Sequence, residues 1–219
     1  MEHIAKNLNR LKGDLGSAKL IVVSKYREVE EILAAYQAGQ RIFAENRVQA
    51  LLERREALPA DIEWHLIGHL QTNKVKYIAP FIAMIHSIDS LKLLQEVDWQ
   101  AGRQNRVIDC LLQVHVAKEE TKFGFDPDEL RTFLQAGDWK ELQHVRICGL
   151  MAMATNTTDT SLIRSEFMQV RALFDELKVN HFTHSDAFSE VSMGMSSDYP
   201  IAVECGSTMV RVGSAVFEG

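Results

Sequence analysis

The chain alternates between two kinds of hydrophobic pattern. Apolar residues spaced three and four apart predict amphipathic helices, whereas short apolar runs rich in β-branched residues predict buried strands. The first segment is predicted to be helical because Ile4, Leu8 and Leu11 fall on one face. The run Leu20–Val23 then predicts a strand that is buried on both faces. The sequence therefore opens with a helix followed by a strand.

The same alternation continues to the end of the chain and predicts seven further strands. Between successive strands, either apolar residues at helical spacing or a helix-capping residue predicts a helix. The predicted strands are Leu20–Val23, Ile42–Ala44, Trp64–Ile67, Ala83–His86, a segment within Val107–Val116, Val145–Leu150, His181–His184 and Met209–Val212. Between the last two, we expect a short helix with Ser197 as its N-cap that ends at Gly206.

Helices between all the strands imply parallel pairing through right-handed crossovers. Eight such units in 219 residues fit a closed (β/α)8 barrel of the TIM type, which needs about 200–250 residues. We expect one domain over residues 1–219, because no linker or low-complexity segment interrupts the chain. The alternative is an open doubly wound sheet, but no Gly-x-Gly-x-x-Gly follows the first strand.

The outer ring of such a barrel needs eight helices, and the sequence predicts only seven between the strands. The chain ends at Gly219, soon after the last strand, so we expect no helix there. We therefore predict that the N-terminal helix occupies the vacant place beside the last strand.

Composition and charge exclude several classes of protein. Apolar residues make up 46% and charged residues 25%, as in ordinary globular domains, and the net charge of −6 argues against non-specific binding to nucleic acid. Cys110, Cys148 and Cys205 form no CxxC pair, which disfavours a disulfide framework or a structural zinc site. The sequence begins without a signal-peptide core, and no apolar run approaches the roughly 18 residues that span a bilayer. We expect a soluble cytoplasmic protein with no metal and no membrane partner.

Functional residues of parallel barrels lie just after the carboxyl ends of the strands. Lys25 holds such a position after four apolar residues. Partial desolvation there would favour the neutral amine, which is a nucleophile toward aldehydes. An ordinary ion pair with a neighbouring carboxylate is the alternative.

Two late segments have the composition of an anion site. The segment 192–197 places glycine and serine before a helix N-terminus, and Gly213 and Ser214 follow the last strand. Barrels frequently bind phosphate after strands seven and eight through backbone N–H groups, although ordinary turns use the same residues. Arg211 lies in an apolar run, where a charge must face either a ligand or a partner inside the barrel.

The histidines after the third strand are weak candidates for a metal site. His65 and His69 are four apart, but no glutamate lies between them and His65 is in a predicted strand. Hydrogen-bonded histidines are therefore the better interpretation.

Six segments together resemble one family. They are Val22–Lys25, Ala44–Gln49, Trp64–Lys74, Gly149–Met151, Val191–Asp198 and Gly206–Ser214. In this order they resemble the pyridoxal phosphate homeostasis proteins, which are fold type III barrels that bind pyridoxal 5′-phosphate (PLP) and are related to the N-terminal domain of alanine racemase. The resemblance spans nearly the whole chain. Its most specific parts are Trp-His-x-Ile-Gly-His-x-Gln and Ser-Met-Gly-Met-Ser.

This resemblance implies a cofactor, PLP, and roles for particular residues. Lys25 would form a Schiff base with the PLP aldehyde, and Arg211 would face the pyridine nitrogen. A cation there keeps the nitrogen unprotonated and makes the ring a weaker electron sink. The implied phosphate ligands, largely through backbone N–H groups, are Ser192, Met193, Gly213 and Ser214, and Asn46 and His65 would line the ring pocket.

The sequence departs from the family pattern at three places. No proline follows Lys25 closely, Ala44 replaces a frequent glycine, and the chain ends in Phe-Glu-Gly. None of these changes removes an implied PLP contact. Lys122 resembles a family lysine near the site.

The resemblance implies a PLP carrier and buffer in intracellular PLP homeostasis, without an established catalytic activity. We expect a monomer whose partners are PLP and the apo forms of PLP-dependent enzymes. One alternative is a small PLP-dependent amino-acid racemase or lyase. Alanine racemase, however, needs a second base and a second domain, for which we expect no residues here. A barrel that binds a phosphate ligand without a covalent bond is the other alternative.

Overall fold

The computed structural model describes residues 1–118 and 123–219. Within these residues, eight strands pair in parallel in chain order, and β1 pairs with β8 to close the barrel. The strands are β1 (Lys19–Val23), β2 (Ile42–Glu45), β3 (Glu63–Leu66), β4 (Met84–Ile88), β5 (Ile108–His115), β6 (Val145–Met153), β7 (Glu190–Ser192) and β8 (Met209–Val212). The predicted (β/α)8 barrel is therefore confirmed.

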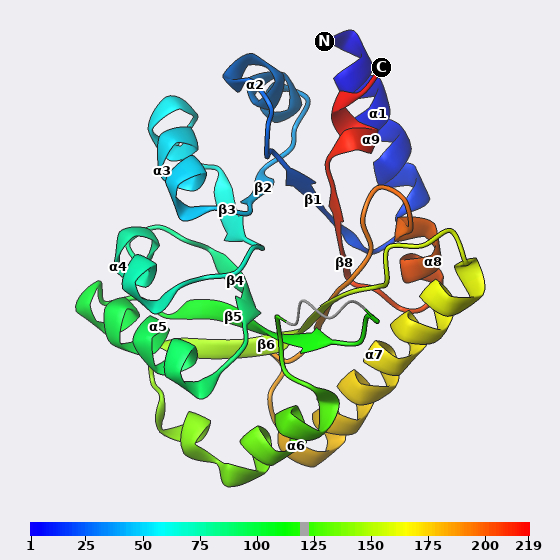
Figure 1. The fold of residues 1–219 in the computed structure, drawn as a ribbon. Coiled ribbons are helices and arrows are strands. Elements are labelled where there is room, and N and C mark those ends of the chain that lie inside the picture. Colours follow the sequence, from blue (N-terminus) through cyan, green and yellow to red (C-terminus); the bar gives the residue numbers. More distant parts are fainter. Residues whose placement is uncertain (119–122) are drawn as a thin grey trace.

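The helices surround the barrel on its outside (Figure 1). The α-helices are α1 (Glu2–Asp14), α2 (Val29–Gln37), α3 (Val48–Ala57), α4 (Val75–Ile78), α5 (Leu91–Arg103), α6 (Pro127–Ala136), α7 (Thr160–His181), α8 (Tyr199–Glu204) and α9 (Ser214–Phe217). Two short 3-10 helices, η1 (Thr72–Lys74) and η2 (Asp138–Glu141), precede α4 and β6. No helix among the described residues is both long and apolar enough to cross a membrane.

The N-terminal helix α1 lies beside α9 at the junction of β8 and β1, as predicted (Figure 1). The side chain of Asn7 donates hydrogen bonds to the carbonyl oxygens of Val216, at 3.1 Å, and Glu218, at 2.9 Å. These bonds satisfy carbonyls at the end of α9, which have no partner within so short a helix. The expectation of no helix after the last strand was wrong, because four residues are enough for one turn that α1 caps from outside.

The seventh strand is not where the sequence pattern placed it. His181 is the last residue of α7, and β7 is Glu190–Ser192 instead. The apolar character of the predicted strand comes from Phe182, which is buried and stacks on Phe188 with ring centroids 4.0 Å apart. A short apolar run cannot by itself distinguish a strand from the packed end of a helix. The N-cap of α8 is also one residue later than expected, at Asp198.

The alternation of side chains along the strands gives the barrel two apolar regions. On β1, Leu20 and Val22 face the helices and belong to the outer core, whereas Ile21 faces the interior. The inner apolar cluster consists of Ile21, Ala44, Met84, Leu111, Cys148, Met151 and Met209. The interior also holds buried polar side chains, among them His65, His86 and Arg211. Polar groups thus occupy a part of the barrel that packing alone would fill with apolar residues.

Candidate functional site

The carboxyl ends of the strands open on a cavity of about 830 Å³. The cavity is lined by residues that follow β1, β2, β3 and β8, as expected for the functional end of a barrel. Five of the predicted site residues line it: Lys25, Asn46, Arg211, Gly213 and Ser214. His65, Ser192 and Met193 do not line it and are buried below. Lys122 lies outside the described residues.

Lys25 lies at the rim of the cavity directly after β1 and is exposed. This exposure does not favour partial desolvation of the amine, which was one of the two interpretations of Lys25. Beneath it, Ser24 is buried and donates a hydrogen bond of 2.7 Å to Oε1 of Glu45, whose carboxyl is 2% exposed. Burial raises the pKa of Glu45. Tyr26 adopts a φ of 62°, which is unusual for a bulky residue and fixes the direction of the chain after Lys25.

Asn46 lines this site and carries an unsatisfied polar atom. Its Oδ1 is buried and has no hydrogen-bond partner in the part of the chain that the structure describes. Gly68 permits this arrangement, because a Cβ at that position would lie 2.1 Å from the carbonyl oxygen of Asn46. A buried polar group without a partner costs about 1–3 kcal/mol, and such atoms in native proteins call for an explanation such as a bound ligand.

Two loops bring backbone N–H groups together on another wall of the cavity. The hydroxyl oxygen of Ser196 accepts from the N–H groups of Gly213, at 3.2 Å, and Ala215, at 3.4 Å. The N–H of Met193 is instead used within the sheet, where it donates to the carbonyl of Met209 at 3.1 Å. The N–H of Met195 is also used, because it donates to Oδ1 of Asp198 at 2.6 Å. We call the N–H groups of Gly213 and Ala215, which converge on the hydroxyl of Ser196, the N–H cradle.

Arg211 projects from β8 into the floor of the cavity and is 4% exposed. Its guanidinium donates to the carbonyl oxygens of Ser192, at 2.8 Å, and Ala152, at 3.0 Å, and to the hydroxyl of Ser192 at 2.7 Å. Burial lowers the pKa of Arg211 to about 10, which still leaves it charged at neutral pH. The cation is thus held by neutral oxygens at the bottom of the site.

A chain of buried hydrogen bonds continues from Arg211 through the barrel. The hydroxyl of Ser192 is 3.0 Å from Nδ1 of His86, and Nε2 of His86 is 2.9 Å from Nδ1 of His65. An arginine can only donate, so Ser192 accepts from it and directs its own proton to His86. His86 then donates through Nε2 to His65, which assigns the Nε2–H tautomer to both rings.

Desolvation keeps both histidines neutral. Burial lowers the pKa of His65 to about 3 and that of His86 well below its usual range, and the charge of Arg211 lowers the latter further. His86 was not predicted as a site residue, because its only signal is a histidine at the end of an apolar strand. Ser196 was predicted only as part of the segment 192–197, without a separate role.

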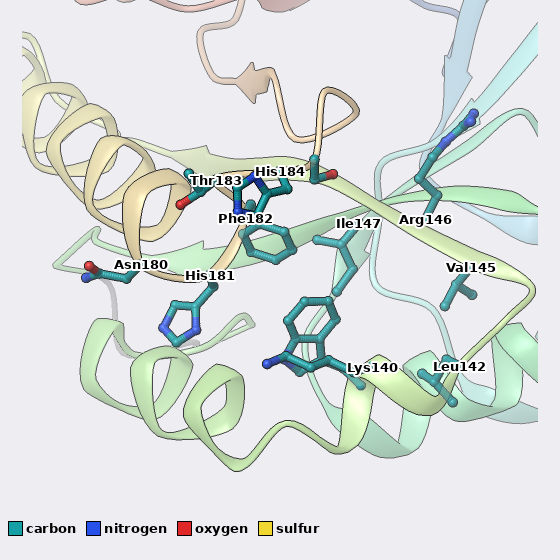
Figure 2. A pocket seen from close by; sticks show the side chains of 12 residues that line it. Lys140, Leu142, Val145, Arg146, Ile147, Asn180, His181, Phe182, Thr183 and His184 are labelled. Atoms are coloured by element: carbon teal, nitrogen blue, oxygen red, sulfur yellow. The ribbon is translucent and has the colours of Figure 1, made fainter.

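A second cavity, of about 600 Å³, lies at the opposite end of the barrel (Figure 2). It is lined by the first residues of β6 and by the end of α7, with Lys140, His181 and His184 around it. The rings of Trp139 and Phe182 form its apolar wall, with centroids 4.9 Å apart. Residues at the amino ends of barrel strands serve stability rather than chemistry, so the first cavity is the better candidate.

Among the described residues, no group of three or more histidine, cysteine or acidic side chains is placed to hold a metal ion. The three cysteines are free and buried. The polar groups that line the first cavity include Lys25, Asn46, Arg211 and Gly213 of the N–H cradle.

Comparison with known proteins places this chain in a family. The family model described as "Alanine racemase, N-terminal domain" matches residues 1–219. A pyridoxal phosphate homeostasis protein of Aquifex aeolicus is 38% identical over 218 residues, covering 99% of this chain and 93% of the relative. One from Haemophilus influenzae is 34% identical over 220 residues and covers 99% of this chain and 90% of the relative.

Comparison with solved structures points to the same family. PipY of Synechococcus elongatus, solved with PLP bound, has a TM-score of 0.89 and 38% identity, and the alignment covers 98% of this chain and 99% of that one. Alanine racemase of Bartonella henselae shares the barrel with a TM-score of 0.75 at 17% identity, but the match covers 59% of its chain. The chain described here belongs to the pyridoxal phosphate homeostasis protein family, within the larger group of alanine racemase N-terminal domains.

Proposed function

We propose that this protein binds PLP in the 830 Å³ cavity and acts as a carrier and buffer of the cofactor in PLP homeostasis. The observation that carries the proposal is the meeting of three groups in one cavity: an exposed lysine, a buried cation and an N–H cradle. The names of the relatives and the PLP-bound PipY structure support the same ligand.

The residues present fit PLP on independent grounds. Asn46 lines the cavity and its Oδ1 has no hydrogen-bond partner in the described part of the chain. The N–H groups of Gly213 and Ala215 already converge on one oxygen, that of Ser196. A phosphate oxygen is a stronger acceptor than a hydroxyl and would satisfy the same donors. PLP supplies an aldehyde that condenses with amines and a ring that accepts electrons. Lys25 would bond the aldehyde, and Ser196, Ser197, Gly213 and Ser214 would surround the phosphate.

Arg211 favours storage of the cofactor over catalysis. In the proposed orientation its guanidinium faces the pyridine nitrogen, where a positive charge disfavours protonation of the ring. Ser192 and Ala152 fix the guanidinium from below, so it cannot turn away from the ligand. An unprotonated ring withdraws electrons weakly, which slows racemisation or elimination from any amino acid that reaches the site.

Binding of PLP is tested by absorbance and by chemical trapping. We expect titration of the purified protein with PLP to produce a visible absorption band, and borohydride reduction followed by peptide mass spectrometry to place the adduct on Lys25. The Lys25→Ala variant should lose the band and the adduct. Lys140→Ala removes an exposed lysine beside the second cavity and is the matched control, because it should retain both.

Three outcomes would contradict parts of this proposal. Absence of the band in the wild-type protein would exclude PLP binding. An adduct on another lysine, with Lys25→Ala unaffected, would exclude the Schiff base on Lys25. Interconversion of D- and L-alanine at ordinary enzyme rates, about 1 s⁻¹ or more, would favour a racemase over a carrier.

We further propose that residues 1–219 form a single domain that works as a cytoplasmic monomer and passes PLP to apo forms of PLP-dependent enzymes. Sedimentation analysis tests the monomer, and reactivation of a PLP-depleted aminotransferase by the loaded protein tests the transfer. A dimer, or reactivation no faster than with an equal amount of free PLP, would contradict these points.

A further inference from the structure

The side chains of His69 and Asp89 pair beside the cavity, and none of the roles assigned above involves this pair. Nδ1 of His69 lies 3.2 Å from Oδ2 of Asp89. The imidazole also stacks on the ring of Phe123, with centroids 4.4 Å apart and an angle of 29° between the planes. A carboxylate bonded to one nitrogen of an imidazole is the arrangement that orients histidine for proton transfer.

Asp89 is the fixed member of the pair. Its side chain is 19% exposed, compared with 41% for His69, and its Oδ1 accepts a hydrogen bond of 3.2 Å from Ser90. Ser90 is in turn the N-cap of α5, where its hydroxyl accepts from the N–H of Leu93 at 3.3 Å. The carboxylate is therefore anchored to the start of a 13-residue helix, and the imidazole is the member that a ligand can reach.

His69 and Lys25 line the same cavity. They follow β3 and β1, which are separated only by β2, and neighbouring strands are about 4.8 Å apart, so the two strand ends are about 10 Å apart. Asn46 follows β2, the strand between β1 and β3, and lines the same cavity. Asp89 occupies Nδ1 of the ring, and no hydrogen bond to Nε2 is found within residues 1–118 and 123–219. A ligand bound to Lys25 in this cavity therefore lies in a space that His69 also lines.

We propose that His69, oriented by Asp89, is the proton-transfer residue that speeds the making and breaking of the bond between Lys25 and PLP. The inference rests on the proposed function and adds to it a rate-controlling group. A carrier needs such a group because a covalently held cofactor must also be released, and proton transfers limit the exchange of amines and water at a carbonyl carbon.

The proton balance of the step needs only the imidazole and water. On loading, a C=N bond between Lys25 Nζ and the aldehyde carbon replaces the C=O bond. The neutral amine loses two protons, and the aldehyde oxygen gains two protons and leaves as one water molecule. His69 takes each proton from the nitrogen and gives it to the oxygen, so the ring ends in the state in which it began. Release by water reverses every transfer.

This role predicts a kinetic signature without a change in affinity. Because one proton-transfer group serves both directions, its loss must slow loading and release by the same factor and leave the Kd for PLP unchanged. General acid–base groups contribute about 10²–10⁴ in rate, and water competes at a half-exposed ring. We therefore expect His69→Gln to slow both rates about 100-fold, at the lower end of that range. Asp89→Asn keeps the shape but loses the charge, and should slow both rates by a smaller factor.

Loading is measured by mixing the PLP-free protein with PLP in a stopped-flow instrument and following the visible absorption band. Release is measured by diluting the loaded protein into excess Nα-acetyl-lysine as the acceptor, and separately into buffer alone. His184→Gln, an exposed histidine beside the second cavity, is the matched control and should keep wild-type rates. In His69→Ala, added imidazole should restore part of both rates, which a purely structural role of the ring would not allow.

Equal slowing of loading and release with an unchanged Kd and rescue by imidazole would support the inference. Wild-type rates in His69→Gln, or a weakened Kd caused by faster release, would overturn it while leaving PLP binding intact. Failure of the wild-type protein to take up PLP would instead overturn the proposed function, and this inference with it.

Discussion

The hydrogen-bonded histidines inside the barrel predict a specific dependence of stability on pH. Burial holds the pKa of His65 at about 3 and that of His86 well below its usual range, whereas both would titrate near 6.5 in the unfolded chain. Below pH 6.5 the unfolded state therefore binds protons that the folded state does not. Stability should be fully present above pH 6.5 and should fall as the pH is lowered toward 3.

The expected loss follows from linkage. Between pH 7 and pH 5, a histidine that stays neutral in the folded state and titrates near 6.5 when unfolded loses about 2 kcal/mol of stability. His65 and His86 together should therefore lower the free energy of unfolding by about 4 kcal/mol. That is a large part of the 5–15 kcal/mol typical of a folded domain. Burial of Glu45 acts in the opposite direction, because its raised pKa lets the folded state take up a proton first.

The assay is urea unfolding followed by tryptophan fluorescence at pH 7 and pH 5. His86→Gln removes one of the two buried titrating groups, so its loss of stability between the two pH values should be about 2 kcal/mol smaller than in the wild-type protein. The contribution of Glu45 is common to both proteins and cancels in this comparison. His184→Gln removes an exposed histidine and should leave the pH dependence unchanged. An equal pH dependence in the wild-type protein and His86→Gln would refute the neutral, buried state of His86.

Two substitutions test the packing and the ligand site. Gly149→Ala should destabilise the protein by about 3 kcal/mol or more in urea unfolding, because φ is 151° and a Cβ would lie 1.7 Å from the carbonyl oxygen of Glu190. Gly13→Ala, an exposed helical position with open space, is its control and should stabilise by up to about 1 kcal/mol. Asn46→Leu removes an unpaired buried acceptor, so the stability of the PLP-free protein should be unchanged or higher. The Kd for PLP should rise at least tenfold. An unchanged Kd would exclude Asn46 as a ligand contact.

The sequence predicted the barrel well because its main signals are local. Short apolar runs separated by helical stripes define the order of elements, and parallel pairing follows from the crossovers. The seventh strand was misplaced because Phe182 is apolar for a different reason, namely its stack on Phe188. The final helix α9 was missed because its stability comes from Asn7, which is more than 200 residues away in the chain. Contacts of this kind leave no periodic pattern in the sequence.

The candidate site was predictable to the extent that its residues follow strand ends. Lys25, Asn46, Gly213 and Ser214 were found by that rule and by the family resemblance. Arg211 was found as a charge within an apolar run, and all five line one cavity. The exposure of Lys25 could not be predicted, since it depends on how far the loops after the strands fold over the amine. The link from Arg211 to His86 was also hidden, because it joins β8 to β4 across the barrel through Ser192.

The site separates the groups that hold a ligand from the group that would bond it. Arg211 and its chain of neutral hydrogen-bond partners are buried and fixed, and the N–H cradle is built from two loops that are bonded to each other through Ser196. Lys25, in contrast, is exposed and reachable by water and by other amines. A catalytic lysine benefits from a closed, dry environment that protects reactive states. An open lysine above a rigid non-covalent cradle instead suits a cofactor that must be retained, released and taken up again.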